Sequence, residues 1–184
     1  MRPWLALLAV AAACAAILVA GEPAKLALRY ERDALLDGQL WRALTGHLVH
    51  LSWGHLAANV AVGALVVALF RRDLGWAAPL LCALGVTLGL FLFLLRLKWY
   101  AGLSGVFYGL VVYGALMASR RRRIWLLAVA AVAAKVIVDL FLGASAAAVE
   151  FVGGPIIVEA HLFGAVSGAL AFALLCRPGP ARRQ

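Results

Sequence analysis

The feature that most constrains this chain is its division into six apolar runs, each about as long as a helix that crosses a lipid bilayer. The runs cover residues 4–20, 54–70, 75–95, 101–118, 124–142 and 156–176. An α-helix needs about 20 apolar residues to cross the hydrocarbon core of a membrane. With 66% hydrophobic and 14% charged residues, the chain leaves no segment for a water-soluble domain. The pattern predicts an all-α membrane protein, a six-transmembrane-helix bundle that forms one domain over residues 1–184.

The first apolar run can be a cleaved signal peptide or a retained helix, because it follows a basic residue and ends in small residues. The run has 17 residues. The apolar part of a usual signal peptide is shorter, about 7–15 residues. We therefore expect a retained first helix.

The longest polar stretch lies between the first two runs, from Gly21 to Ser52. Its acidic and basic side chains cancel in charge, and leucines and Trp41 are interleaved with them. This composition indicates a segment that lies at the membrane surface.

The basic residues indicate how the chain is oriented, because lysines and arginines near helix ends are retained on the cytoplasmic side. Six spans place ten basic residues on one side, including the run Arg120–Arg123, and six on the other. Both termini are therefore predicted to be cytoplasmic. The formal net charge of +9 has the same origin, so we expect no nucleic-acid partner.

The three cysteines, Cys14, Cys82 and Cys176, all lie within apolar runs. This placement suits small buried side chains better than a disulfide framework or a metal cluster. The sequence predicts no cofactor and no metal site.

Ionisable side chains inside a membrane helix are costly, so each marks a structural pair or a working site. Lys135 and Asp139 lie four residues apart in the fifth run and share a helix face. Mutual neutralisation explains this pair more simply than a transport role. Glu159 lies near the outer end of the sixth run, where it can reach water, and an orienting role for neighbouring groups is the alternative.

A set of polar residues converges on one depth of the predicted bundle. The second, fourth and sixth helices all enter from the outer side, and one to two turns below it they carry His55, Asn59, Ser104 and His161. Ser104 lies at a helix start, which offers unpaired amides to an anion. A serine hydroxyl becomes a nucleophile when an imidazole takes its proton, and His161 is the candidate base.

Two further patterns support this grouping. Gly164 and Gly168 follow His161 at helical spacing, so the sixth helix can pack closely against a neighbour. If that neighbour is the fourth helix, the imidazole can reach the hydroxyl. His55 and Asn59 share one face of the second helix and can donate hydrogen bonds to an oxyanion.

These residues resemble the motifs of the rhomboid intramembrane serine proteases, and the resemblance spans most of the chain. The matching pieces are Trp41-Arg42, His50-x4-His55-x3-Asn59, Gly102-Leu103-Ser104-Gly105 and Ala160-His161-x2-Gly164. The resemblance implies a six-helix rhomboid-like bundle that cleaves transmembrane proteins with a serine–histidine dyad. It implies that Ser104 is the nucleophile, that His161 is the general base, and that His55 and Asn59 form the oxyanion hole.

The resemblance also assigns supporting roles. Tyr108 resembles the aromatic residue that supports the histidine ring, and His50 resembles a structural histidine near a water-accessible cavity. Trp41 and Arg42 resemble a loop motif that stabilises the fold at the membrane surface. The supporting glycines are Gly102, Gly105 and Gly164. The chain departs from some rhomboids at Gly46, where they carry a histidine whose role is absent here or is taken by His47.

Within the family, the segments Trp41–His47 and Trp99–Gly105 look most like rhombosortase, a bacterial subgroup. That resemblance implies an inner-membrane protein whose site opens to the periplasmic side. Its substrates would carry a C-terminal Gly-Gly motif, a transmembrane helix and a basic tail.

Two other functions fit parts of the sequence. A catalytically silent rhomboid-like protein would bind transmembrane helices without cutting them. A metal or proton transporter would use His47, His50 and His55 as ligands. These histidines straddle a loop and a helix start at one membrane face, which does not make a path across the membrane.

Overall fold

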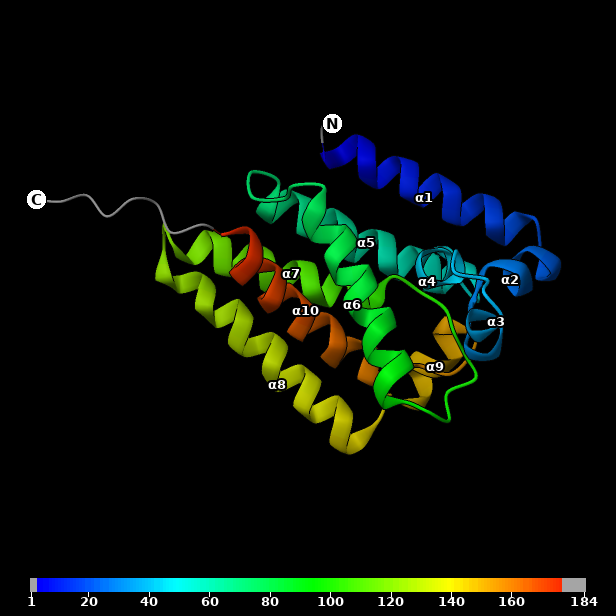
Figure 1. The fold of residues 1–184 in the computed structure, drawn as a ribbon. Helices are drawn as coiled ribbons and strands as arrows, with labels where there is room; N and C mark the ends of the chain where they lie inside the picture. Colours follow the sequence, from blue (N-terminus) through cyan, green and yellow to red (C-terminus); the bar gives the residue numbers. More distant parts are fainter. Residues whose placement is uncertain (1–2, 177–184) are drawn as a thin grey trace, which may run out of the picture.

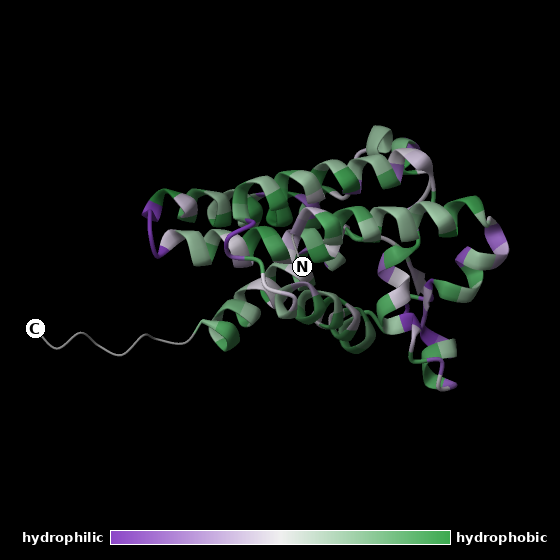
Figure 2. Ribbon diagram, turned by 90° about the horizontal axis from the view of Figure 1, so that it is seen from above, coloured by the Kyte–Doolittle hydropathy of each residue, from purple (hydrophilic) through white to green (hydrophobic). Residues whose placement is uncertain are grey.

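The computed structural model describes residues 3–176, and almost all of this part of the chain is helical. Each of the six apolar runs forms a long helix whose bounds differ from the expected ones by a few residues. These helices are α1 (Pro3–Val19), α5 (Trp53–Phe70), α6 (Ala77–Phe93), α7 (Ser104–Ser119), α8 (Leu126–Leu142) and α10 (Glu159–Leu175). Figure 2 shows that their residues are mostly hydrophobic and that hydrophilic residues gather in the connections.

Two helical segments, Trp53–Phe70 and Arg123–Leu142, are long and apolar enough to cross a membrane. The second of these includes η2 (Arg123–Trp125), a 3-10 turn that leads into α8. The other four long helices are also apolar but have 16 or 17 residues. That length is at the lower limit for a membrane span, so the crossing of all six helices stays a prediction.

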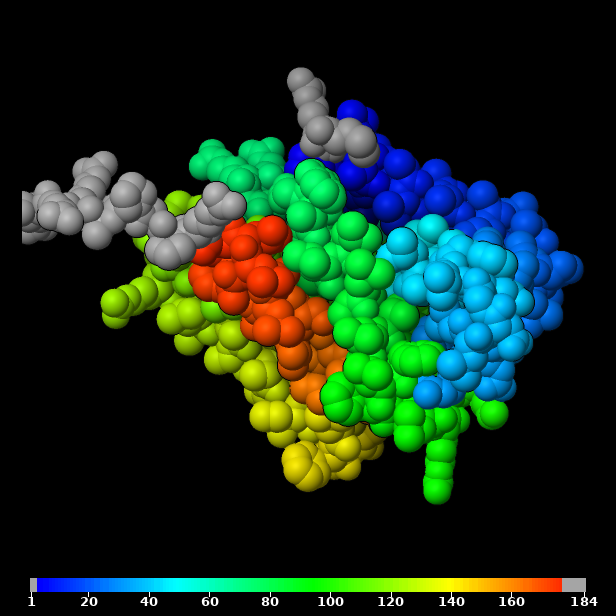
Figure 3. Space-filling view, viewed as in Figure 1, coloured from blue at the N-terminus to red at the C-terminus, as the bar shows by residue number. Residues whose placement is uncertain are grey.

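Helix α7 occupies the centre of the bundle. It packs against α5, α6, α8 and α10, whereas α1 packs against α5 at the edge (Figure 1). The space-filling view shows α10 seated between α6 and α8 (Figure 3). This arrangement brings the start of α10 beside the start of α7, where the candidate site lies.

Glycines set the close approach of α7 and α10. A Cβ atom on Gly164 would collide with the carbonyl oxygen of Gly105, and one on Gly168 would collide with that of Gly109. In the other direction, a Cβ on Gly105 would lie 2.7 Å from the carbonyl oxygen of Ala160. The two backbones therefore meet at a distance that only glycine permits.

The stretch from Gly21 to Ser52 folds into short elements at one end of the bundle. They are α2 (Glu22–Leu28), β1 (Tyr30–Glu31), α3 (Arg32–Leu36), α4 (Arg42–Thr45) and η1 (Gly46–Leu48). Strand β1 pairs antiparallel with β2 (Trp99–Tyr100), with Tyr30 opposite Tyr100. This pairing ties the stretch to the segment that leads into α7. At the same end, α9 (Ala146–Val152) precedes α10 and packs against α5.

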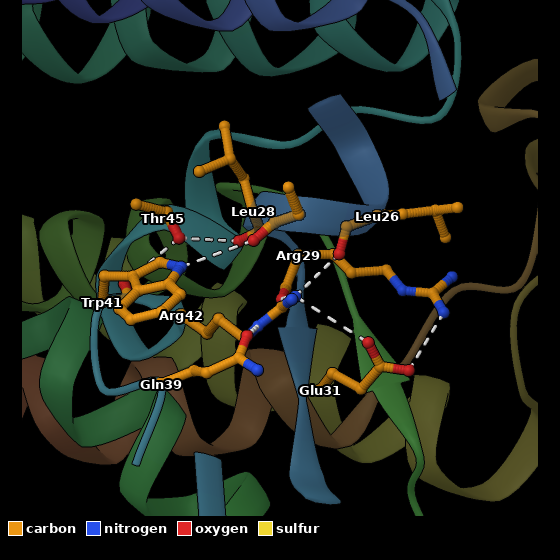
Figure 4. Close-up of polar contacts among 9 residues, drawn as sticks. Leu26, Leu28, Arg29, Glu31, Gln39, Trp41, Arg42 and Thr45 are labelled. Atoms are coloured by element: carbon orange, nitrogen blue, oxygen red, sulfur yellow. Dashed lines mark hydrogen bonds and ion pairs between the residues drawn. The ribbon is translucent and has the colours of Figure 1, made fainter. Parts of the chain in front are cut away.

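Arg42 holds this stretch together (Figure 4). Its buried guanidinium donates to the carbonyl oxygens of Leu26 and Arg29 at 2.7 and 2.9 Å, and to the side chain of Gln39 at 2.7 Å. Trp41 is half exposed, and its indole N–H donates to a carbonyl oxygen of the same stretch. These contacts satisfy backbone groups that no regular ladder pairs, which supports the expected stabilising role of both residues.

Candidate active site

Ser104 is the first residue of α7, and a glycine turn places it there. Gly102 has a φ of +125°, which side chains with a Cβ atom rarely adopt. The Tyr100 hydroxyl donates to the Gly102 carbonyl oxygen at 2.9 Å and so fixes the turn. As the first helical residue, Ser104 also presents an amide that has no partner inside the helix.

His161 lies in the first turn of α10 and meets Ser104 directly. Its Nε2 is 3.1 Å from the Ser104 Oγ, within hydrogen-bond distance. Tyr108, one turn after Ser104 on α7, stacks on the imidazole with ring centroids 4.2 Å apart and an angle of 2° between the planes. The sequence predicted this hydroxyl–imidazole contact, and the glycine packing of α7 and α10 explains it.

His55 and Asn59, both buried on α5, line the same cavity as Ser104. The Leu51 amide donates to the His55 Nδ1 at 3.4 Å, so Nδ1 is an acceptor and Nε2 carries the hydrogen of the neutral ring. That Nε2 faces the Gly102 turn, because a Cβ on Gly102 would lie 2.8 Å from it. Asn59 donates one amide hydrogen to the His55 carbonyl oxygen at 3.1 Å and keeps a second for another acceptor.

His47 and His50 support the site from outside the cavity. His47 contacts the Gly102 carbonyl oxygen through Nδ1 at 3.4 Å and the Ala83 carbonyl oxygen through Nε2 at 3.0 Å. His50 is fully buried and packs its ring edge against His55, with centroids 4.7 Å apart. Burial lowers the pKa of both histidines, which favours the neutral rings.

The packing around Gly46 explains why this chain has no histidine at that position, unlike some rhomboids. A Cβ atom at this position would lie 2.6 Å from the Tyr30 backbone nitrogen, so β1 occupies the space of a side chain. The neighbouring His47 instead contacts the turn that carries Ser104.

A cavity of about 180 Å³ brings these groups together. Its walls come from α5, α7, the start of α10 and the segment between α9 and α10. The lining residues are His55, Ala58, Asn59, Val62, Tyr100, Ala101, Ser104, Phe107, Tyr108, Val152, Pro155, Ile156, Ile157 and His161. The cavity is mostly apolar, and its polar side chains are the serine, the asparagine, two histidines and two tyrosines.

Asp139 is a further polar neighbour of His161. Its carboxylate accepts from the Lys135 ammonium at 2.5 and 2.6 Å, so the predicted pairing of these two residues is confirmed. The sequence did not predict that Asp139 also faces His161, with Oδ2 3.7 Å from Nδ1. The sequence could have indicated this contact by the depth of Asp139 in the bundle. Asp139 lies one turn from the end of α8, and that end adjoins the start of α10.

The cavity-lining segment of Pro155, Ile156 and Ile157 was also missed. The apolar run 156–176 predicts Ile156 and Ile157 inside the sixth helix, but the chain is not helical between α9 and Glu159. Within residues 3–176, no group of three or more His, Cys, Asp or Glu side chains is arranged to hold a metal ion.

The fold and the site define a helical membrane protein in which a serine and a histidine from neighbouring helices meet in a cavity. Comparison with protein families gives a match to the rhomboid domain over residues 37–178. The chain therefore belongs to the rhomboid family of intramembrane proteases, which act on transmembrane proteins and also include inactive members. Comparison with curated proteins gave no match.

Proposed function

We propose that this protein is an active intramembrane serine endopeptidase that cleaves single-span membrane proteins. The observation that carries the proposal is the 3.1 Å contact between the Ser104 Oγ and the His161 Nε2 inside a cavity that also holds His55 and Asn59. A helix-binding protein without activity needs none of these contacts. Their joint presence favours catalysis over the silent alternative.

The proposed reaction is acyl transfer. His161 Nε2 takes the proton of Ser104 as Oγ bonds to the substrate carbonyl carbon. The resulting oxyanion accepts hydrogen bonds from His55 Nε2–H, the free Asn59 amide hydrogen and the Ser104 amide. His161 then gives its proton to the leaving amine as the C–N bond breaks. Water attacks the acyl-enzyme and loses its proton to His161. His161 then returns that proton to Ser104 Oγ as the ester bond breaks, which releases the new carboxyl terminus.

Access for a substrate helix is proposed between α5 and α8. A groove of about 240 Å³ lies there and shares Val62, Phe107 and Tyr108 with the cavity. A transmembrane segment that unwinds at its outer end could pass a short extended stretch from this groove to Ser104.

We further propose that six spans carry the site on the periplasmic side of a bacterial inner membrane, with both termini in the cytoplasm. The distribution of lysines and arginines supports this orientation. The rhombosortase-like segments support substrates that end in a Gly-Gly motif, a helix and a basic tail.

The transporter alternative has less support. His47 already contacts the carbonyl oxygen of Ala83, and His50 contacts that of Leu48. His47 contacts the turn that carries Ser104, and His50 packs on His55, so both lie at one end of the bundle and do not extend along it.

The test is labelling of the purified protein by a fluorophosphonate, together with co-expression of a Gly-Gly, helix and basic-tail substrate. We expect Ser104→Ala and His161→Ala to abolish labelling and to lower cleavage by about 10⁴-fold or more. Ser119→Ala is the matched control, because Ser119 lies at the other end of α7 and bonds to the Leu116 carbonyl oxygen. Mass spectrometry of the product locates the cut. Intact processing by Ser104→Ala would refute the proposal.

A further inference from the structure

The second ring nitrogen of His161 has no role in the reaction proposed above. Nδ1 is buried and has no hydrogen-bond partner in the part of the chain that the structure describes. For Nε2 to accept the Ser104 proton, Nδ1 must carry the ring hydrogen. A buried N–H without an acceptor is unfavourable, and more so when the ring becomes an imidazolium during the reaction.

The Asp139 carboxylate is placed to accept this hydrogen. Its Oδ2 lies 3.7 Å from Nδ1, and both side chains are about nine-tenths buried. Tyr108 stacks on the imidazole face and holds the plane of the ring in which Nδ1 lies. A typical N–H···O bond is about 2.9 Å long, and such bonds in free enzymes often tighten when substrate binds.

The burial of the Lys135–Asp139 pair is uneven in a way that neutralisation alone does not require. The Lys135 side chain is 58% exposed and the Asp139 side chain 10%. Two charges that only cancel each other could both lie on the outer surface of α8. Here the carboxylate instead turns inward to α10, and the ammonium reaches over it from outside.

We propose that Asp139 is a positioning residue for His161, which makes the site a Ser104–His161–Asp139 triad with Lys135 holding the carboxylate. Asp139 accepts Nδ1–H, fixes the tautomer that leaves Nε2 free, and stabilises the imidazolium. In the first step the proton passes from Ser104 Oγ to His161 Nε2, and Asp139 stays ionised throughout the reaction. This inference rests on the proposed protease function.

The test compares the wild type with Lys135→Met/Asp139→Asn, a double variant in which no charge is left unpaired. The probe is a fluorophosphonate, whose phosphorus bonds to Ser104 Oγ as fluoride leaves and the proton passes to His161. Varying the probe concentration separates kinact from KI. We expect kinact to fall about 10²-fold or more with KI unchanged; loss of the carboxylate from a fully formed triad costs about 10⁴-fold.

A structural role for the pair makes the opposite prediction. If the two charges only neutralise each other, the double variant should unfold at the wild-type temperature in detergent and react at the wild-type kinact. That result would overturn the inference.

Asp139→Glu is a second variant that decides the question even if the double variant does not fold. It keeps the charge and the partner of Lys135 but moves the carboxylate by one methylene. Positioning predicts a kinact below that of the wild type at an unchanged unfolding temperature, whereas neutralisation predicts an unchanged kinact.

Failure of the inference is distinguishable from failure of the proposed function. Wild-type protein that does not react at Ser104 refutes the protease proposal and the triad with it. Wild-type protein that reacts at Ser104 while both Asp139 variants match its kinact refutes the triad alone.

Discussion

Individual side chains in this site are oriented by contacts that leave one polar atom free for chemistry. His55 shows this most clearly, because the Leu51 amide occupies Nδ1 and leaves Nε2–H toward the Gly102 turn. Asn59 likewise donates one amide hydrogen to the His55 carbonyl oxygen, which leaves the other free. Such fixed donors stabilise a developing oxyanion without reorganising during the reaction.

His55→Phe should therefore lower kcat by about 10²-fold with little change in KM, because it removes a transition-state hydrogen bond but keeps a ring in place. Cleavage of the single-span substrate measures both constants. An unchanged unfolding temperature serves as the control for folding. A folded variant with wild-type kcat would exclude His55 from the oxyanion site.

His47 gives a pH dependence of stability. Burial holds its pKa below the usual value of 6.5, so the folded protein keeps the ring neutral while the unfolded chain protonates it. Its contribution to stability is present above pH 6.5 and is lost as the pH falls toward the folded-state pKa. Between about pH 7.5 and pH 5.5, the unfolding temperature of the wild type should fall more than that of His47→Gln. Equal slopes would contradict this.

Much of the site could be predicted from the sequence because its residues sit near helix starts. Ser104, His55 and His161 could be placed at one depth from the positions of apolar runs alone. The proximity of Asp139 to His161 could not. Lys135 and Asp139 mark one polar face of the helix in the sequence, but the sequence does not say which neighbouring helix that face meets.

Helices α7 and α10 act as one unit, and glycine sets their spacing. The apolar runs predicted all six long helices. They did not predict the β1–β2 pair, because strands of two residues have no periodic hydrophobic pattern. They also began the fourth and sixth helices three residues early. Gly102 with its positive φ and the non-helical stretch after Gly153 explain the late starts of α7 and α10.

Gly164→Ala tests the spacing of these helices. The added methyl group would collide with the Gly105 carbonyl oxygen, so we expect a loss of about 1–3 kcal/mol of stability and slower labelling of Ser104. Gly75→Ala is the matched control, because nothing lies within 4 Å of a Cβ atom there. Thermal unfolding in detergent and fluorophosphonate labelling report the two effects. Equal behaviour of both variants would show that the close approach is dispensable.

At the scale of the whole molecule, the site lies at one end of the bundle and the arginine-rich turns lie at the other. The turn after α7 begins the run Arg120–Arg123, and Arg121 pairs there with Asp73 from the turn after α5. Arg42 and the short elements it binds are at the site end. Because the arginine-rich end is predicted to face the cytoplasm, the cavity should open to the periplasm.

Single cysteines test this orientation. Ala147→Cys lies on exposed α9 at the site end, and Gly75→Cys lies in the connection of α5 and α6 at the arginine-rich end. A membrane-impermeant maleimide added to intact spheroplasts should label the first variant, and the second only after the membrane is broken. Both cysteines are introduced into Cys176→Ala, which is also the blank, because Cys14 and Cys82 are buried whereas Cys176 is partly exposed and would itself react once the membrane is broken. The reverse pattern would mean that the cavity opens to the cytoplasm. A cut on that side would remove the basic tail of the substrate but leave its Gly-Gly motif attached to the transmembrane helix.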